Sequence, residues 1–136
     1  MYLLDTNVVS EIRKPRPHGG VITWLKATAA EQIYIAAAVV GELQIGVERT
    51  RRQDLQKAQE LERWVDQVCK VYEIIPMKAP EFREWARMLE GKSEDLARDA
   101  MIAATARVHR MTVVTRNTKD FRYFPVETYN PFHYKP

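Results

Sequence analysis

Short apolar runs alternate along this chain with longer amphipathic segments, and this alternation limits the fold more than any other feature. We expect strands at residues 1–4, 32–36, 71–75, 111–115 and 126–129, and helices at 8–13, 21–30, 37–47, 52–69, 80–90 and 94–110. Strands separated by helices indicate βαβ units and therefore a mostly parallel sheet. The sequence predicts an α/β domain with a central sheet of four to five strands.

The bulk composition places few other limits on the chain. Its 136 residues suit a single domain, residues 1–136, and the mixture of 46% hydrophobic with 29% charged residues is typical of globular proteins. No run approaches the ~20 apolar residues that span a bilayer, and no signal peptide is recognisable. Cys69 is the only cysteine, which fits a reducing compartment. We therefore expect a cytoplasmic protein with no membrane partner, and we expect Cys69 to be packed within its helix.

Three acidic residues lie in apolar surroundings, whereas most of the 18 acidic residues belong to charged helix faces. Asp5 follows the first apolar run directly. Glu42 is the only charged residue in the window 36–47, and Asp99 precedes the uncharged residues 100–106. Acidic side chains are seldom buried without a partner or a metal. Taken singly, each acid is most simply a partly exposed residue or a helix cap, but the three together indicate a shared site.

Parallel topology brings at least two of these acids to one edge of the sheet. Asp5 ends the first strand, and Glu42 lies one turn into the helix that starts at the carboxyl end of the second strand. The topology determines the location of Asp99 less directly. Two carboxylates ~5 Å apart repel each other by about 3 kcal/mol at an effective dielectric constant of ~20. Three carboxylates therefore need shared protons or a cation, and an oxygen-only set suits Mg²⁺ or Mn²⁺, ions that commonly bind phosphates.

Small polar groups follow the strand at 111–115 without a gap. Thr115 and Asn117 can hold a metal-bound water or orient a carboxylate. The alternative is an ordinary turn in which Asn117 or Thr118 caps the next helix. The sequence leaves both interpretations open.

Four motifs in this order and spacing resemble those of PIN-domain ribonucleases, and more narrowly of the VapC and FitB-like toxins of bacterial toxin–antitoxin pairs. The resemblance extends over the whole chain. The motifs are Leu4-Asp5-Thr6-Asn7, Gly41-Glu42-Leu43 followed by Gly46, residues 99–106 and residues 114–121, and the ending at residues 129–132 is also similar.

The resemblance implies a three-layer α/β/α domain that hydrolyses RNA phosphodiester bonds with Mg²⁺, for which Mn²⁺ can substitute. Asp5, Glu42 and Asp99 match the metal-site acids of the family, and Thr6 and Thr115 match its supporting polar residues. In-line attack is expected to leave a 5′-phosphate and a 3′-hydroxyl.

The chain departs from the family pattern at one site position. Asn117 stands where many relatives have a fourth acid, which puts the occupancy of a second metal in question. Asp120 either substitutes for that acid or simply lies near a helix end. The catalytic set predicted by the resemblance is therefore Asp5, Glu42, Asp99 and Asn117.

An acidic site repels RNA, so a basic rim is needed beside it. Arg116 is the strongest candidate because it adjoins Thr115 in the sequence. The resemblance also implies a homodimer and a cognate antitoxin that covers the acidic groove in a hetero-oligomer. The other basic candidates are Arg13, Lys14, Arg16, Arg49, Arg51, Arg52 and Lys119.

Two other functions compete with this interpretation. Phosphatases that form an aspartyl phosphate also begin with a strand ending in Asp, but they carry a second acid where this chain has Asn7. They also need further catalytic residues after the strand that ends at Thr115, where 21 residues remain. The second alternative is a PIN-like binding or assembly module without catalysis, and the retention of all three acids argues against it.

Overall fold

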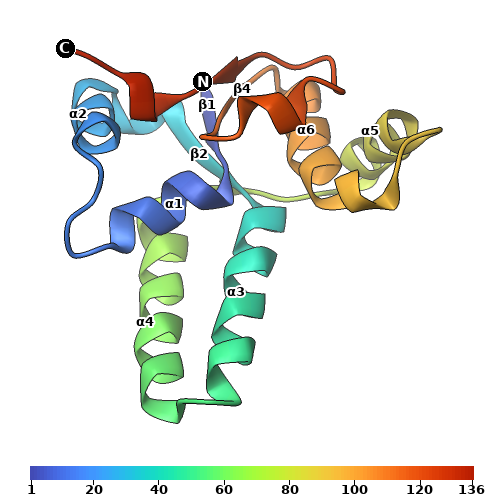
Figure 1. The fold of residues 1–136 in the computed structure, drawn as a ribbon. Coiled ribbons are helices and arrows are strands. Elements are labelled where there is room, and N and C mark those ends of the chain that lie inside the picture. Colours follow the sequence, from blue (N-terminus) through green and yellow to red (C-terminus); the bar gives the residue numbers. More distant parts are fainter.

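Five short strands form one central sheet in which every neighbouring pair is parallel (Figure 1). The computed structural model describes residues 1–136. The strand order is β3-β2-β1-β4-β5, so the predicted mostly parallel sheet of four to five strands is confirmed. The strands are β1 (Tyr2–Leu4), β2 (Ile33–Ala36), β3 (Glu73–Ile75), β4 (Thr112–Val114) and β5 (Thr128–Tyr129).

Six helices connect the strands, and four of them form two adjacent pairs. Helices α3 and α4 pack along each other as a long hairpin that extends away from the sheet, and α5 packs on α6 (Figure 1). The helices are α1 (Thr6–Arg13), α2 (Gly19–Ala27), α3 (Ala37–Arg51), α4 (Leu55–Val71), α5 (Ala79–Leu89) and α6 (Ala97–His109).

The strand order divides the helices between the two faces of the sheet. The chain steps from β1 to β2 to β3 in one direction, and then returns past β2 and β1 to place β4 on the other side of β1. Because parallel crossovers are right-handed, the reversal of direction sends α5 and α6 to the face opposite α1–α4. The result is the three-layer α/β/α architecture that the resemblance implies.

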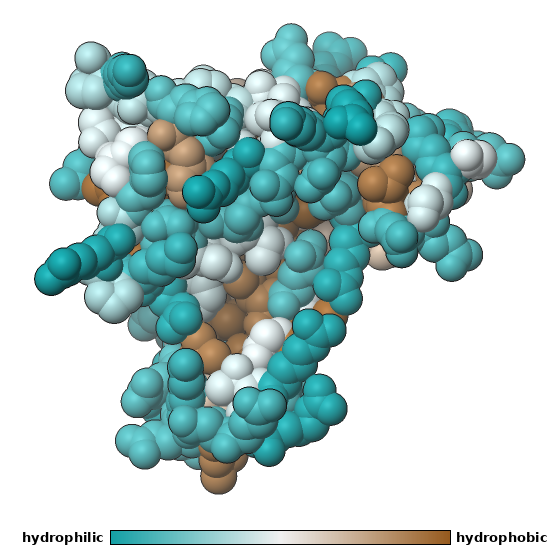
Figure 2. Space-filling model, viewed as in Figure 1, coloured by the Kyte–Doolittle hydropathy of each residue, from teal (hydrophilic) through white to brown (hydrophobic).

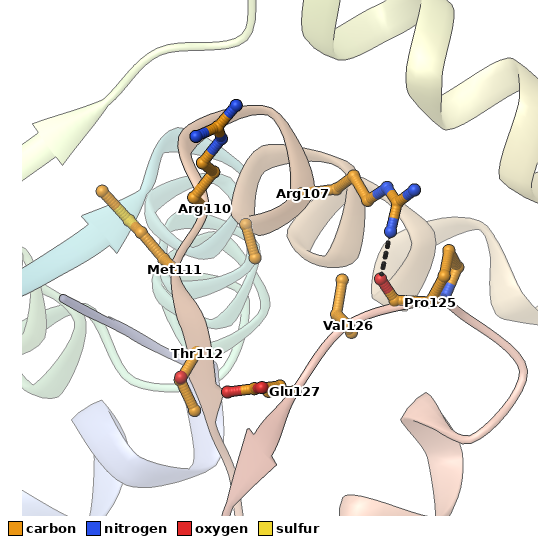
Figure 3. Close-up of a pocket in the computed structure, with 8 residues that line it drawn as sticks. Arg107, Arg110, Met111, Thr112, Pro125, Val126 and Glu127 are labelled. Carbon is orange, nitrogen blue, oxygen red and sulfur yellow. Dashed lines mark hydrogen bonds between the residues drawn. The ribbon is translucent and has the colours of Figure 1, made fainter.

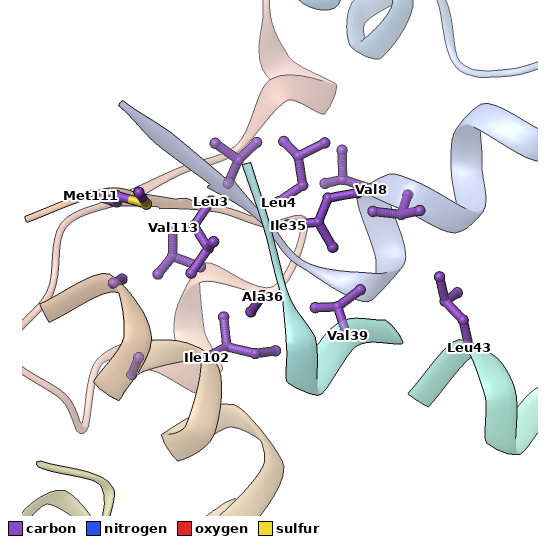
Figure 4. Packing of buried hydrophobic residues seen from close by; sticks show 14 of the residues in the cluster. Leu3, Leu4, Val8, Ile35, Ala36, Val39, Leu43, Ile102, Met111 and Val113 are labelled. Atoms are coloured by element: carbon purple, nitrogen blue, oxygen red, sulfur yellow. The ribbon is translucent and has the colours of Figure 1, made fainter. Parts of the chain in front are cut away.

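The centre of the sheet is closed to solvent on both faces. Leu3 and Leu4 point to opposite faces of β1 and are both fully buried, as are Val113 and Val114 of β4 (Figure 4). Helix α6 buries residues 102–104 and two further alanines against this centre. Small side chains let α6 approach the sheet closely, which explains the uncharged stretch that follows Asp99.

Several element boundaries differ from the predicted ones. The strand predicted at 71–75 starts only at Glu73, because β2 offers partners to residues 73–75, and Val71 completes α4 instead. The helix predicted at 94–110 is divided: a 3₁₀ turn at Glu94–Leu96 precedes α6. After the last strand, where no helix was predicted, the chain contains a 3₁₀ turn at Pro131–His133.

Two further sequence expectations meet different outcomes. Cys69 is exposed, so the prediction that it packs within its helix is wrong, because α4 turns this position away from its buried face. None of the helices combines the length and the apolar character that crossing a membrane demands.

Candidate active site

Asp5 lies at the point where the sheet reverses its winding direction. Strands β1 and β4 are neighbours whose following segments leave toward opposite faces, and such a switch point opens a crevice at the carboxyl ends of the strands. The backbone N–H of Asp5 donates to the carbonyl of Val114 at 2.9 Å, which extends the pairing of β1 with β4 by one residue. The predicted strand-end acid therefore stands in the crevice that the fold itself creates.

Neutral donors surround the carboxylate of Asp5, which is only 6% exposed. Its Oδ1 accepts from the backbone N–H of Thr6 at 2.7 Å, and its Oδ2 accepts from the Thr115 hydroxyl at 2.7 Å and from Asn7 Nδ2 at 3.2 Å. Burial raises the pKa of Asp5, and these three hydrogen bonds offset part of that rise. No cation pairs with Asp5, so this buried acid lacks the partner that a purely structural acid requires.

Asn7 joins the ends of β1 and β4 and was missed as a site residue by the sequence reasoning. Its Nδ2 donates to Thr115 Oγ1 at 3.2 Å as well as to Asp5, and its Oδ1 accepts from the backbone N–H of Arg116 at 3.0 Å. The signal was a carboxamide in the first turn of the helix after Asp5. Such a side chain can satisfy donors and acceptors from two strand ends at once.

Glu42 approaches Asp5 from the second turn of α3 and is partly buried. Burial is the main cause that raises the pKa of Glu42, and the charge of Asp5 raises it further. Arg98, which the sequence reasoning also missed, lowers it. The Thr6 hydroxyl lies close enough to lower this pKa as well, yet Thr6 Oγ1 is buried without a hydrogen bond of normal geometry. A buried hydroxyl without a partner beside two acids is a group that a bound ion or its water can satisfy.

Asp99 reaches the same place from the first turn of α6, on the opposite face of the sheet. Burial raises the pKa of Asp99 to about 6, and the charges of Asp5, Asp120 and Glu42 add to that rise in this order. The three acids predicted from the sequence therefore act on one another electrostatically. Carboxylates in this relation hold a proton or bind a cation.

The structure separates the two candidates for the fourth position. Asp120, in the 3₁₀ turn Thr118–Phe121, contributes negative charge to both Asp5 and Asp99. Asn117 is exposed and meets the cluster through its backbone, whose N–H donates to Thr115 Oγ1 at 3.0 Å, while its side chain forms no hydrogen bond there. Of these two residues, Asp120 is therefore the one that adds negative charge to the cluster.

The donor set of the cluster fits a hard divalent cation. The side-chain atoms available as metal ligands are oxygen atoms of Asp, Glu and Thr. No histidine or cysteine belongs to the cluster. No group of three or more Asp, Glu, His or Cys side chains is close enough together to hold a metal ion by itself. An ion would therefore need water or substrate oxygens as additional ligands, which is usual for Mg²⁺.

One cavity lies elsewhere on the molecule. It measures about 480 Å³ and is lined by the end of α6, the start of β4 and the segment before β5, so it opens at the amino ends of the strands, away from Asp5 (Figure 3). A smaller hollow of about 250 Å³ adjoins the acidic cluster. It lies between α1, α3 and α4 and has Thr6, Arg13 and Glu42 on its wall.

Several of the predicted basic rim residues are already engaged within the protein. Lys14 pairs with Glu11 at 2.9 Å, and Arg51 pairs with Glu62 of α4 at 2.6 Å. Arg116 pairs with no carboxylate, and its guanidinium lies over the ring of Phe132. Arg116 therefore has no ion-pair partner within the protein, while Arg98, which was not among the predicted rim residues, is the cation whose charge acts on Glu42.

A family model described as a PIN domain matches residues 2–126 of the chain. The chain belongs to the PIN-domain family. Toxin FitB of Neisseria gonorrhoeae is 36% identical to this PIN domain over 98% of the chain and 99% of the toxin. VapC ribonuclease Y4jK of Sinorhizobium fredii is 31% identical over 97% and 98% of the two chains. A solved structure of FitAB bound to a DNA fragment contains a chain with 34% identity and a TM-score of 0.83, with 100% and 99% covered. The resemblance drawn from the four motifs is confirmed.

Proposed function

We propose that this PIN domain is a divalent-metal-dependent endoribonuclease and the toxin of a toxin–antitoxin pair. The observation that carries the proposal is the convergence of Asp5, Glu42 and Asp99 at the switch point of the sheet, with raised pKa values and no salt bridge to any of them. The ribonuclease name of the Y4jK relative supports the choice of substrate class. The binding-module alternative does not explain why three mutually repelling acids are retained.

The chain's own residues divide the work as follows. Asp5 and Asp99 would hold the ion, and Glu42 would bind it or orient a water molecule. When bound, Mg²⁺ lowers the pKa of a coordinated water and stabilises charge on the phosphate. Both carboxylate oxygens of Asp5 are held by hydrogen bonds, which come from Thr115, Asn7 and the Thr6 N–H.

Thr6 Oγ1 offers a buried hydroxyl to the same site. The guanidinium of Arg116 would contact an RNA phosphate and offset the negative charge of the acids. Asp120 would take the place of the fourth acid, with Asn117 holding the Thr115 hydroxyl through its backbone.

The test is cleavage of single-stranded RNA in Mg²⁺ or Mn²⁺ with a charge-removing pair of variants. Asp5→Asn keeps the helix cap, because Asn caps as well as Asp, but it removes the central carboxylate. We expect it to lower the cleavage rate by more than about 100-fold, beyond the effect of losing an outer-shell partner. Asp66→Asn, an exposed acid on α4, is the matched control and should cleave like the wild type. Full Mg²⁺-dependent activity in Asp5→Asn would show that the site is wrongly assigned.

We also propose that a cognate antitoxin covers the acidic cluster and the hollow beside it. Figure 2 shows hydrophobic side chains gathered below α1, between α3 and α4, and this hollow is lined by Leu43, Val47, Leu61 and Trp64. The toxin name of FitB and the solved FitAB structure support such a partner. We expect co-purification with a small protein encoded next to this gene, and Leu61→Asp should weaken it. Equal co-purification of both forms would place the contact elsewhere.

A further inference from the structure

Three separate contacts hold Arg116, one of them to Asn7, which also binds Asp5. Its backbone N–H donates to Asn7 Oδ1 at 3.0 Å, and its carbonyl accepts from Asn130 Nδ2 at 3.4 Å. Its guanidinium carbon lies 4.6 Å from the centre of the Phe132 ring. An exposed arginine normally samples many rotamers, so a stacked guanidinium with an anchored backbone is a pre-oriented cation.

The Phe132 ring, on which Arg116 stacks, is held by contacts of its own. Asn130 Oδ1 accepts from the backbone N–H of Phe132 at 2.9 Å, and the Phe132 ring packs on the His18 ring with centroids 5.1 Å apart. The turn Pro131–His133 lies against α2, and Figure 1 shows the end of the chain beside that helix. Phe132 therefore lies between α2 and Arg116, so the position of α2 determines where the guanidinium stacks.

Gly20 makes this docking possible. A Cβ at residue 20 would lie 3.0 Å from the carbonyl oxygen of Pro131 and 3.1 Å from that of Phe132, which is closer than ordinary van der Waals contact. The neighbouring Gly19 has nothing within 4 Å of such a Cβ. Only one of the two adjacent glycines is thus required by the contact with the turn.

We propose that the turn at residues 130–132, docked on α2 through Gly20, positions Arg116 to bind an RNA phosphate beside the acidic cluster. Phe132 is a positioning residue in this scheme, because it acts through Arg116 and does not touch the reacting atoms. The Asn7 side chain accepts from the Arg116 backbone N–H and donates to Asp5, so the backbone of Arg116 and the central carboxylate keep a fixed relation. This inference rests on the proposed ribonuclease function.

The two glycines supply the first test. Gly20→Ala leaves Arg116 and Phe132 unchanged but displaces the turn, whereas Gly19→Ala is the matched control. For Gly20→Ala we expect KM for a single-stranded RNA to rise about two- to five-fold with little change in kcat, the range given by an exposed cation–π contact. Binding of the same RNA in EDTA should weaken equally. The slope of log Kd against log salt should fall by about 0.7, the value for one lost phosphate contact on a single strand.

A second pair of variants separates positioning from mere structural support. Phe132→Leu keeps an apolar side chain under Arg116 but removes the ring, and it should reproduce the changes in KM and salt slope. Arg116→Ala combined with Phe132→Leu should bind RNA no worse than Arg116→Ala alone, because both act through one contact. The stacked pair Arg122 and Tyr123, 4.8 Å apart, serves as the control, and Tyr123→Leu should leave RNA binding unchanged.

The possible failures point to different conclusions. If the wild type cleaves RNA but Gly20→Ala and Phe132→Leu keep wild-type KM and salt slope, the positioning role is overturned while the ribonuclease function stands. If Gly20→Ala unfolds, additive effects of Arg116→Ala and Phe132→Leu would also overturn it. If the wild type cleaves no RNA with Mg²⁺ or Mn²⁺, the proposed function itself fails.

Discussion

Two groups of buried acids in this PIN domain differ in the basic partners that surround them. Glu81, on α5, is 4% exposed, accepts from the backbone N–H of Lys78 at 2.8 Å and lies 2.9 Å from His109 Nε2. Glu11 accepts from Lys14 Nζ at 2.9 Å and from the His18 N–H at 3.0 Å. Burial raises the pKa of Glu81, but its hydrogen bonds outweigh that effect and lower it overall, and Lys14 lowers the pKa of Glu11.

The acids at the switch point form no salt bridge, and only Glu42 has its pKa lowered by a basic group, Arg98. Asp5 has only neutral donors, and the charges of its neighbours raise the pKa of Asp99. Where a buried acid stabilises the fold, the chain supplies a basic group beside it. Where the acids converge at the crevice, no basic group forms a salt bridge with them, and the repulsion that Arg98 leaves is one that a cation can relieve.

The largest contrast is expected from Asp99→Asn. RNA cleavage should fall by more than about 100-fold, because a metal-site acid is lost. The metal-free protein should nevertheless gain stability at pH 7.5. The folded pKa of about 6 exceeds the ordinary value of 3.8, so the ionised form is disfavoured in the folded state.

The gain should shrink as the pH falls from about 6 to 3.8, where wild-type Asp99 becomes protonated in both states. Thermal unfolding in EDTA across this range measures it. A loss of stability at pH 7.5 would show that Asp99 is a structural acid like Glu81.

Glu81→Gln should produce the reverse pattern. The pKa of Glu81 is lowered below its ordinary 4.5, so its contribution is complete above that pH and disappears as the pH falls through the folded pKa. We expect a loss of about 1–3 kcal/mol near pH 7, the cost of weakening hydrogen bonds at a buried group, and a smaller loss below pH 4. Denaturant unfolding at the two pH values measures this difference, and RNA cleavage per folded molecule should stay at the wild-type level. A stability loss that is independent of pH would show that the charge of Glu81 does not stabilise the fold.

The positions of single acids were predictable from the sequence, but their spatial relation was only partly so. Asp5 and Glu42 follow strands, and parallel strands share a carboxyl edge, which brings them together on general grounds. Asp99 depends on α6 crossing to the far face, and that in turn depends on β4 pairing with β1. No residue pattern within the chain specified this pairing.

The residues that the sequence reasoning missed act across long separations in the chain. Asn7 bridges to Thr115 and Arg116, and Arg98 acts on Glu42. Polar side chains in helix turns usually contact solvent, so the carboxamide of Asn7 was only a weak signal and Arg98 gave none. The same limit explains Val71, whose β-branched side chain favours a strand but whose position has no strand partner on β2.

The most direct test of the central claim is a Mn²⁺ titration followed by thermal unfolding, because it needs no substrate. Wild type and Glu81→Gln should both gain stability with rising Mn²⁺, by about 2.7 kcal/mol when the ion exceeds its Kd 100-fold. An Asp5→Ala/Asp99→Ala double variant should show no gain. An unchanged wild-type unfolding temperature, or an equal gain in the double variant, would contradict the assignment of these acids to a metal site.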